Sequence, residues 1–152
     1  MFKYSKLLCL VGLCLLGSIR ASETHVHEVG FIVGEPTGLS ALWQQSSTQA
    51  IDMALAWSLI NNRFIYVHGD YLFYNLSLLE FNDKPLPLYY GVGGRVQLGA
   101  LGSIGMRLPL GIDYHFAGSP FSALIEIAPV INIIPATSVD LNLDLGLRYV
   151  FR

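Results

Sequence analysis

The sequence predicts an all-β fold, an eight-stranded antiparallel up-and-down transmembrane β-barrel that follows a cleaved signal peptide. Three observations lead to this prediction. Apolar and polar side chains alternate without a break over residues 138–151, and the same alternation recurs in seven earlier stretches. Charged residues make up only 13% of the chain, against about 25% in typical soluble proteins. A period of two places successive side chains on opposite faces of a strand, so each strand separates two unlike media.

The amino-terminal segment reads as a secretory signal. Two lysines precede an apolar run at residues 7–16, and Ala21 stands at a suitable cleavage point. A spanning helix needs roughly 20 apolar residues, so this run is short for a transmembrane anchor, which is the alternative interpretation. We expect a signal peptide at residues 1–21 and a barrel domain at residues 22–152. Both cysteines lie in the segment to be removed, so the mature chain has no disulfide.

The first four expected strands carry apolar side chains at every second position. They cover residues 28–34, 38–44, 51–59 and 65–74. Turn-forming residues separate them, with Glu35 and Pro36 after the first, Ser46–Thr48 after the second, and Asn61 and Asn62 after the third. The spacing is that of neighbouring antiparallel strands joined by tight turns.

The last four expected strands repeat the pattern more strongly. They cover residues 88–98, 103–116, 122–133 and 138–151. A polar, proline-marked loop at residues 82–87 precedes them, and residues 117–120 form a turn. Because a proline gives up one ladder hydrogen bond, we expect Pro109 at a bulge and Pro135 in a loop.

The composition of the polar faces favours lipid outside the barrel. In a soluble barrel or sandwich the polar stripes would be the solvated surface and would be rich in lysine, glutamate and threonine. Here they contain glycines and small residues, such as Gly91, Gly93 and Gly105, which suit a cramped interior. We therefore expect an apolar face turned to outer-membrane lipid. A soluble periplasmic β-sandwich or barrel is the alternative.

The charged residues of the strands then share the barrel lumen. Charges in a narrow lumen are tolerable only when they are paired and hydrogen-bonded, so we expect arginines to bridge carboxylates and plug the barrel. A narrow channel for small solutes or ions is the alternative. The expected lumen network consists of Glu28, Asp52, His68, Asp70, Arg95, Arg107, Asp113, His115, Glu126, Asp140, Asp144 and Arg148.

Two histidine–carboxylate pairs lie on the lumen face. His68 with Asp70 and Asp113 with His115 are each two residues apart, as for a base held by a carboxylate. The sequence places no serine nucleophile beside them, so we predict no catalytic residue and no enzymatic activity. A lipid-modifying barrel enzyme is the alternative.

A metal site near the amino terminus is not expected. His25 and His27, near Glu23, have a spacing that could bind a metal, but they stand beside the cleavage site in a segment expected to fray. We assign no metal and no cofactor. After cleavage, eleven acidic residues would stand against six basic ones, because Lys3, Lys6 and Arg20 lie in the removed segment. This mildly acidic balance argues against nucleic acid as a partner.

Several aromatic residues fit the girdles that flank a membrane-facing apolar band. Core packing is the alternative for each one taken singly. They are Trp43, Trp57, Tyr71, Tyr90, Tyr114, Tyr149 and Phe151.

Several segments resemble a group of small bacterial outer-membrane barrels of uncharacterised function, which are similar to the transmembrane domain of OmpA-type proteins. The resemblance implies the barrel fold, an outer-membrane location and assembly by the barrel assembly machinery, and it implies no activity. We expect a monomer. The segments are Gly-Glu-Pro-Thr-Gly-Leu-Ser at 34–40, Leu-Pro-Leu-Tyr-Tyr-Gly at 86–91 with Gly-Gly-Arg at 93–95, Arg-Leu-Pro-Leu-Gly at 107–111, and Glu-Ile-Ala-Pro-Val at 126–130.

Two details depart from the pattern of such barrels. Their chain normally ends on an aromatic residue, whereas Arg152 follows Phe151 here. If the strands alternate in direction from a periplasmic start, the long loop at residues 76–84 falls on the periplasmic side, whereas outside loops are usually the longer ones.

Overall fold

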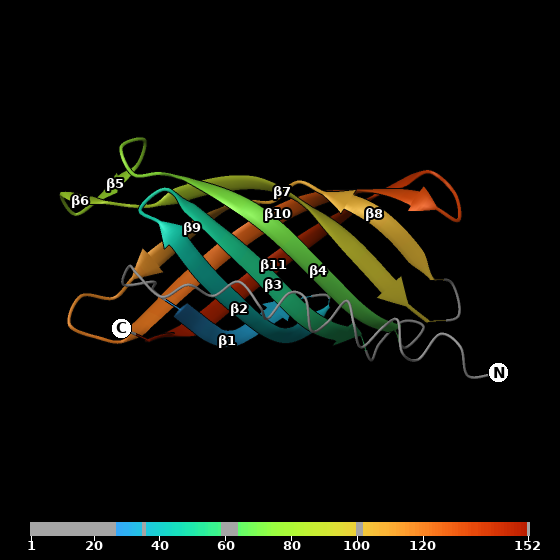
Figure 1. The fold of residues 1–152 in the computed structure, drawn as a ribbon. Helices are drawn as coiled ribbons and strands as arrows, with labels where there is room; N and C mark the ends of the chain where they lie inside the picture. The colour runs from blue at the N-terminus through green and yellow to red at the C-terminus, as the bar shows by residue number, and fades with distance from the viewer. Residues whose placement is uncertain (1–26, 35, 59–63, 100–101, 152) are drawn as a thin grey trace.

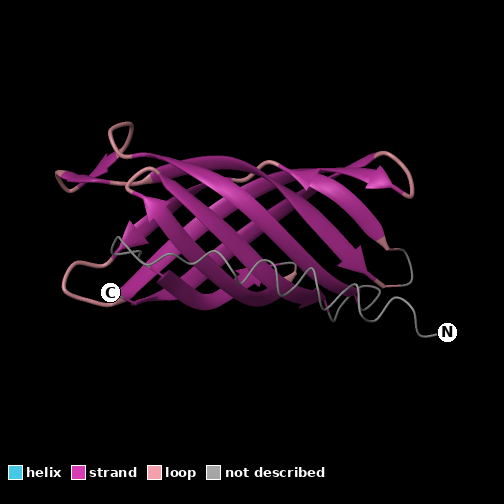
Figure 2. Cartoon of the chain, viewed as in Figure 1, coloured by secondary structure: helices cyan, strands magenta, loops and turns pink. Residues whose placement is uncertain are grey.

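The computed structural model describes residues 27–34, 36–58, 64–99 and 102–151, and the predicted signal peptide lies outside these ranges. The described chain forms strands joined by turns and loops (Figures 1 and 2). None of its segments is a helix long and apolar enough to cross a membrane. The strands are β1 (His27–Gly34), β2 (Thr37–Ser46), β3 (Gln49–Ser58), β4 (Phe64–Asn75), β5 (Glu80–Phe81), β6 (Lys84–Pro85), β7 (Leu88–Leu98), β8 (Ser103–Arg107), β9 (Leu110–His115), β10 (Phe121–Ile134) and β11 (Ser138–Phe151).

The main sheet closes into a barrel. Each wall strand pairs antiparallel with the strands before and after it, and β1 pairs with β11, from His27 opposite Phe151 to Gly34 opposite Asp144. β8 and β9 are two parts of one wall strand, because both lie between β7 and β10. The barrel therefore has eight wall strands, and the predicted fold class is confirmed.

The wall strand formed by β8 and β9 is interrupted at Leu108 and Pro109 without a bulge. The register against β7 is unchanged across the interruption, with Gly93 opposite Arg107 and Tyr90 opposite Leu110. The expected bulge at Pro109 is therefore wrong: the proline removes a ladder hydrogen bond and interrupts the strand, but it does not shift the register. Its carbonyl still accepts from the Gly91 amide at 2.9 Å, but it has no N–H to return the bond.

A second proline, Pro129 of β10, removes a ladder hydrogen bond on the other side of the same interruption. The Pro129 carbonyl accepts from the Leu108 amide at 3.0 Å, and Pro129 likewise has no N–H to donate in return. The register shift in this region lies elsewhere, between Asn132 and Ile134 of β10. Pro135 follows the end of β10 and lies in the loop before β11, as predicted.

The two faces of the wall have the polarity opposite to that of a soluble protein. The outer face is apolar, and its side chains are about half exposed. This outer belt includes Val29, Phe31, Val33, Leu39, Met53, Leu55, Val67, Val92, Val96, Ile125, Leu141, Leu143, Leu145 and Leu147. The inner face contains most of the charged strand residues in buried positions.

The two ends of the barrel differ. We call the end that holds His27 and Phe151 the terminal end. Residues 76–87, which contain the β5–β6 hairpin, also lie at this end because they connect the last residue of β4 to the first of β7 (Figure 1). The opposite end holds the last residues of β1, β3, β7 and β10 and the first residues of β2, β4, β8 and β11.

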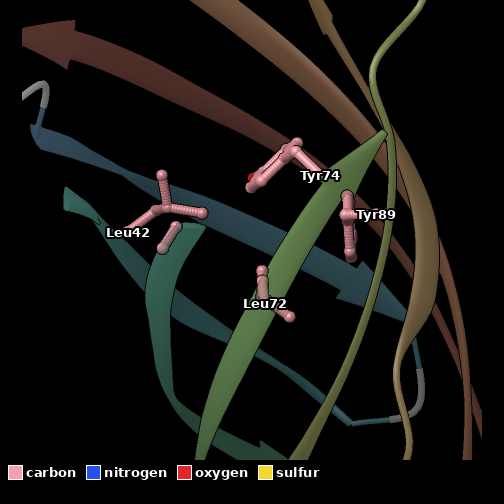
Figure 3. Packing of buried hydrophobic residues seen from close by; sticks show 5 residues of the cluster. Leu42, Leu72, Tyr74 and Tyr89 are labelled. Atoms are coloured by element: carbon pink, nitrogen blue, oxygen red, sulfur yellow. The ribbon is translucent and has the colours of Figure 1, made fainter. Parts of the chain in front are cut away.

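Part of the interior is apolar. Leu42, Ala50, Leu72, Tyr74 and Tyr89 form a buried cluster on the inner side of β2, β3, β4 and β7 (Figure 3). All five are at most 9% exposed. The polar inner face predicted from the sequence is therefore only part of the filling, and aliphatic and tyrosine side chains close one side of the interior toward the terminal end.

Candidate functional site

The buried charges form four levels along the barrel interior. Alternation on β11 sets the spacing, since Asp140, Asp144 and Arg148 are four residues apart and share the inner face. Arg95 lies toward the opposite end, Arg107 near the middle and Arg148 toward the terminal end. A fourth level, nearest the terminal end, holds Glu28 with groups from β9.

The middle level is organised around Arg107, whose side chain is fully buried. Its guanidinium forms ion pairs with Asp70 from β4 and Glu126 from β10, and a third with Asp144 of β11 at 3.3 Å. His68 Nδ1 lies 2.9 Å from Asp70 Oδ2 and 3.0 Å from Arg107 Nη1. One planar cation thus joins carboxylates from three strands, an arrangement suited to the fixed fork of arginine.

The next level is organised around Arg148 on β11. Its Nη2 donates to Asp52 Oδ1 at 2.6 Å and its Nε donates to Ser40 Oγ at 2.9 Å. Arg148 and Asp52 are each 2% exposed. This ion pair ties β11 to β3 across the interior, past β1 and β2, which lie between them in the wall.

The Arg95 level closes onto the opposite end. Arg95 Nη2 donates to Asn132 Oδ1 at 2.5 Å and to Asp140 Oδ2 at 2.6 Å, and Asn142 Nδ2 donates to the Tyr66 hydroxyl at 2.6 Å. Tyr66, Arg95, Asp140 and Asn142 line an open vestibule of about 510 Å³, whose wall also includes Gln97 and Pro36. The Arg95 guanidinium lies over the Tyr66 ring, 5.5 Å from its centroid. Hydrogen-bonded side chains therefore line the inner part of this vestibule.

The fourth level consists of Glu28, Asp113 and His115. His115 Nε2 lies 2.8 Å from Glu28 Oε1, and Ser122 Oγ donates to Glu28 Oε2 at 2.6 Å. Asp113 Oδ2 accepts a long bond of 3.5 Å from the Tyr74 hydroxyl. Both carboxylates are fully buried, whereas the His115 side chain is 37% exposed at the terminal rim.

Comparison with known proteins concerns the fold. No protein-family model and no curated protein sequence matches the chain. Among solved structures, the chain is similar to the crystal structure of the N-terminal β-barrel domain of Pseudomonas aeruginosa OprF, with a TM-score of 0.64 and 12% sequence identity. The two barrels share a fold. The match covers 86% of this chain and all of the OprF chain, and it confirms the barrel fold that the sequence resemblance implied.

The structure brings together most of the residues that the sequence placed in the lumen of this OprF-like barrel. Ten of the twelve are buried, and two lie at the rims: His115 at the terminal end and Asp140, whose side chain is 48% exposed, at the opposite end. The sequence prediction left out the neutral side chains that hydrogen-bond to these charged residues. Their position on the same alternating inner face is the signal that could have identified them. These partners are Ser40, Tyr66, Tyr74, Tyr89, Ser122, Asn132 and Asn142.

The geometry of the barrel interior does not favour nucleophilic catalysis. Ser122 and His115 both contact Glu28, so the carboxylate stands between the hydroxyl and the imidazole. A serine triad needs the imidazole in the middle, where it can take the hydroxyl proton. His68, the other candidate base, lies between Asp70 and the Arg107 guanidinium.

Aromatic side chains gather around the terminal end of the OprF-like barrel. Neighbouring rings contact one another in three groups and a pair, with centroids 4.8–6.2 Å apart. Trp57 is separate from this set, because it lies near the end of β3 at the opposite end. The terminal-end rings are Tyr71, Phe73 and Tyr90; Phe81, Tyr114 and Phe116; Phe121, Tyr149 and Phe151; and Trp43 with His27.

Proposed function

We propose that this protein is an integral outer-membrane β-barrel with a structural or surface-interaction role and a plugged, charged lumen. The observation that carries the proposal is the inverted polarity of the wall, with aliphatic side chains outside and ion pairs inside. Exposure of this much apolar surface to water would be unfavourable, and soluble monomers rarely show a contiguous apolar patch above a few hundred Å². Lipid requires such a surface.

The closed ladder supports the same location. In hydrocarbon an unpaired backbone amide or carbonyl costs several kcal/mol, so a sheet can enter a bilayer only when it closes and leaves no edge. Pairing between β1 and β11 supplies that closure. The aromatic rings around the terminal end match the girdle expected where the apolar band meets lipid headgroups. A barrel without free edges also has no need of a partner subunit, which favours a monomer.

The plugged lumen is supported by the three arginine levels. Each guanidinium is at most 4% exposed and binds side chains from other strands. Breaking a buried ion pair leaves an uncompensated charge, so these bridges resist opening. The buried cluster of Leu42, Leu72, Tyr74 and Tyr89 narrows the interior further (Figure 3). We expect a role that needs the outer surface or the rims rather than a path through the barrel.

Membrane partition tests the location. The full chain, expressed in a Gram-negative host, is expected in the outer-membrane fraction after salt and carbonate washing. Folded barrel is expected to migrate differently from heat-denatured chain on a gel. Release by a salt wash, together with no heat-dependent shift, would overturn the membrane proposal and favour the soluble sandwich.

Planar-bilayer recordings test the plug. We expect purified protein to give no discrete conductance steps. Steps from the wild type that disappear in Arg107→Ala would refute the plug and support a narrow channel through the Arg107 level. Incubation with lipopolysaccharide and phospholipid tests the enzymatic alternative, and we expect both lipids to be recovered unchanged.

A further inference from the structure

Two fully buried carboxylates and one rim histidine meet at the terminal end of the barrel. Glu28 comes from β1, and Asp113 and His115 come from β9. One candidate ligand atom from each residue lies within 4.8 Å of the other two. Glu28 and Asp113 are both 0% exposed, while His115 is open to solvent. The cluster is therefore buried on one side and accessible on the other.

This level differs in charge from the other three. Each of those contains a guanidinium that forms ion pairs with its carboxylates. In the described part of the chain, no arginine or lysine forms an ion pair with Glu28 or Asp113. Arg148, on the neighbouring level, directs its hydrogen bonds to Asp52 and Ser40. Arg148 acts on Glu28 and Asp113 only from the neighbouring level. Among the described residues, neither carboxylate therefore has a guanidinium or ammonium group in an ion pair of its own.

One carboxylate oxygen of this cluster has no hydrogen-bond partner within the described part of the chain. Among the described residues, Asp113 Oδ1 is buried and receives no hydrogen bond, although buried polar atoms nearly always find one. The other oxygens are already oriented. Ser122 Oγ donates to Glu28 Oε2 at 2.6 Å, and the Tyr74 hydroxyl lies 3.5 Å from Asp113 Oδ2. Such outer contacts hold metal-binding carboxylates in place in known sites.

We propose that Glu28, Asp113 and His115 form a site for one divalent transition-metal cation, of the class represented by Zn²⁺. One imidazole nitrogen and two carboxylate oxygens are a donor set that Zn²⁺ takes, with water in the fourth position. Bonds of about 2.0–2.1 Å place tetrahedral ligand atoms about 3.3 Å apart. His115 Nε2 and Glu28 Oε1 are already within 2.8 Å, so the cation must separate them slightly and draw in Asp113.

The second histidine–carboxylate cluster of the interior does not fit a metal in the same way. Asp52, His68 and Asp70 also bring candidate ligand atoms within 4.8 Å of one another. Their carboxylates, however, already bind Arg148 and Arg107. A guanidinium occupies the place of the cation there, which makes this cluster an internal comparison for the proposed site.

Zinc titration of the full chain, folded in detergent micelles and stripped with a chelator, tests the proposal. Equilibrium dialysis is expected to show one Zn²⁺ per barrel. Asp113→Asn and His115→Ala are each expected to weaken binding at least about tenfold, while heat-dependent gel mobility shows that both variants fold. Asp113→Asn removes a buried like charge, so we expect it to fold at least as well as the wild type.

Two controls distinguish this site from others. His27→Ala removes the other described histidine at the terminal end, and its zinc affinity is expected to equal that of the wild type. His68→Ala, in the arginine-filled cluster, is expected to retain binding provided that its gel mobility shows a folded barrel. No binding by the wild type at millimolar zinc would overturn the proposal. Equal binding by wild type, Asp113→Asn and His115→Ala, or loss of binding in folded His27→Ala or His68→Ala, would overturn it as well.

Discussion

Leu145→Arg tests whether the outer face of the barrel meets lipid. Leu145 lies near the middle of β11, is 53% exposed and points outward between Val33 and Ile125 of the neighbouring strands. At a bilayer midplane, arginine on the lipid face costs roughly 2–4 kcal/mol. On a water-exposed surface the same substitution should stay within about 0.5 kcal/mol. The two environments therefore predict different free energies of unfolding.

Val139→Arg is the matched control on the same strand and the same face. Val139 is 72% exposed and lies six residues from Leu145. At about 3.4 Å per residue and a tilt of about 40°, that separation is about 15 Å along the bilayer normal. The apolar band is about 25 Å tall, so Val139 falls near or beyond its edge, where arginine costs roughly 0–1 kcal/mol.

Reversible denaturant unfolding in lipid vesicles, followed by the fluorescence of the two tryptophans, measures both costs. We expect Leu145→Arg to lower the free energy of unfolding by roughly 2–4 kcal/mol and Val139→Arg by no more than roughly 1 kcal/mol. Equal effects at the two positions would refute the argument from depth. A neutral Leu145→Arg would refute the assignment of this face to lipid.

Two further substitutions test the interior. Gly93→Ala is expected to lower the free energy of unfolding by at least about 1–3 kcal/mol, because its Cβ would overlap Asp70 Oδ1 and the Gly69 carbonyl oxygen. Gly94→Ala should be tolerated, because the nearest atom to its Cβ would be 4.0 Å away. Equal unfolding free energies for the two variants would contradict this reasoning. Arg107→Ala is expected to lower the free energy of unfolding by roughly 3–5 kcal/mol, because it leaves three buried carboxylates without their cation. Asp144→Asn should lower it much less in the same assay, since the bond from Arg107 to Asp144 is the long one at 3.3 Å.

The strands and their faces could be predicted because a period of two is local information. Residues 88–98 and 138–151 are strands with the predicted bounds, since each alternating run ends at a turn-forming or proline-containing segment. Pro109 shows the limit of local reasoning. A proline in a strand can be accommodated by a bulge or by a lost hydrogen bond, and the register on both sides decides between them.

The pairing inside the barrel could not be predicted because it depends on the shear between distant strands. Arg107 contacts Asp70, Glu126 and Asp144, which lie on β4, β10 and β11. The sequence indicates which side chains face inward, but not which of them share a level. For the same reason the cluster of Glu28 with His115, 87 residues apart, gave no signal as a metal site.

The junction between β1 and β11 has a consequence for how the molecule assembles. Because His27 pairs with Phe151, the ring is joined by the first and last strands of the described chain, and every hairpin between them forms from neighbouring segments. A sheet of the other seven wall strands alone would have two unpaired edges, those of β1 and β10, and such edges can pair with another chain. The pairing of β1 with β11 joins segments far apart in the sequence, and contacts of this kind form slowly. A chaperone that shields those edges before insertion would therefore act on the chain while the pairing of β1 with β11 has still to form.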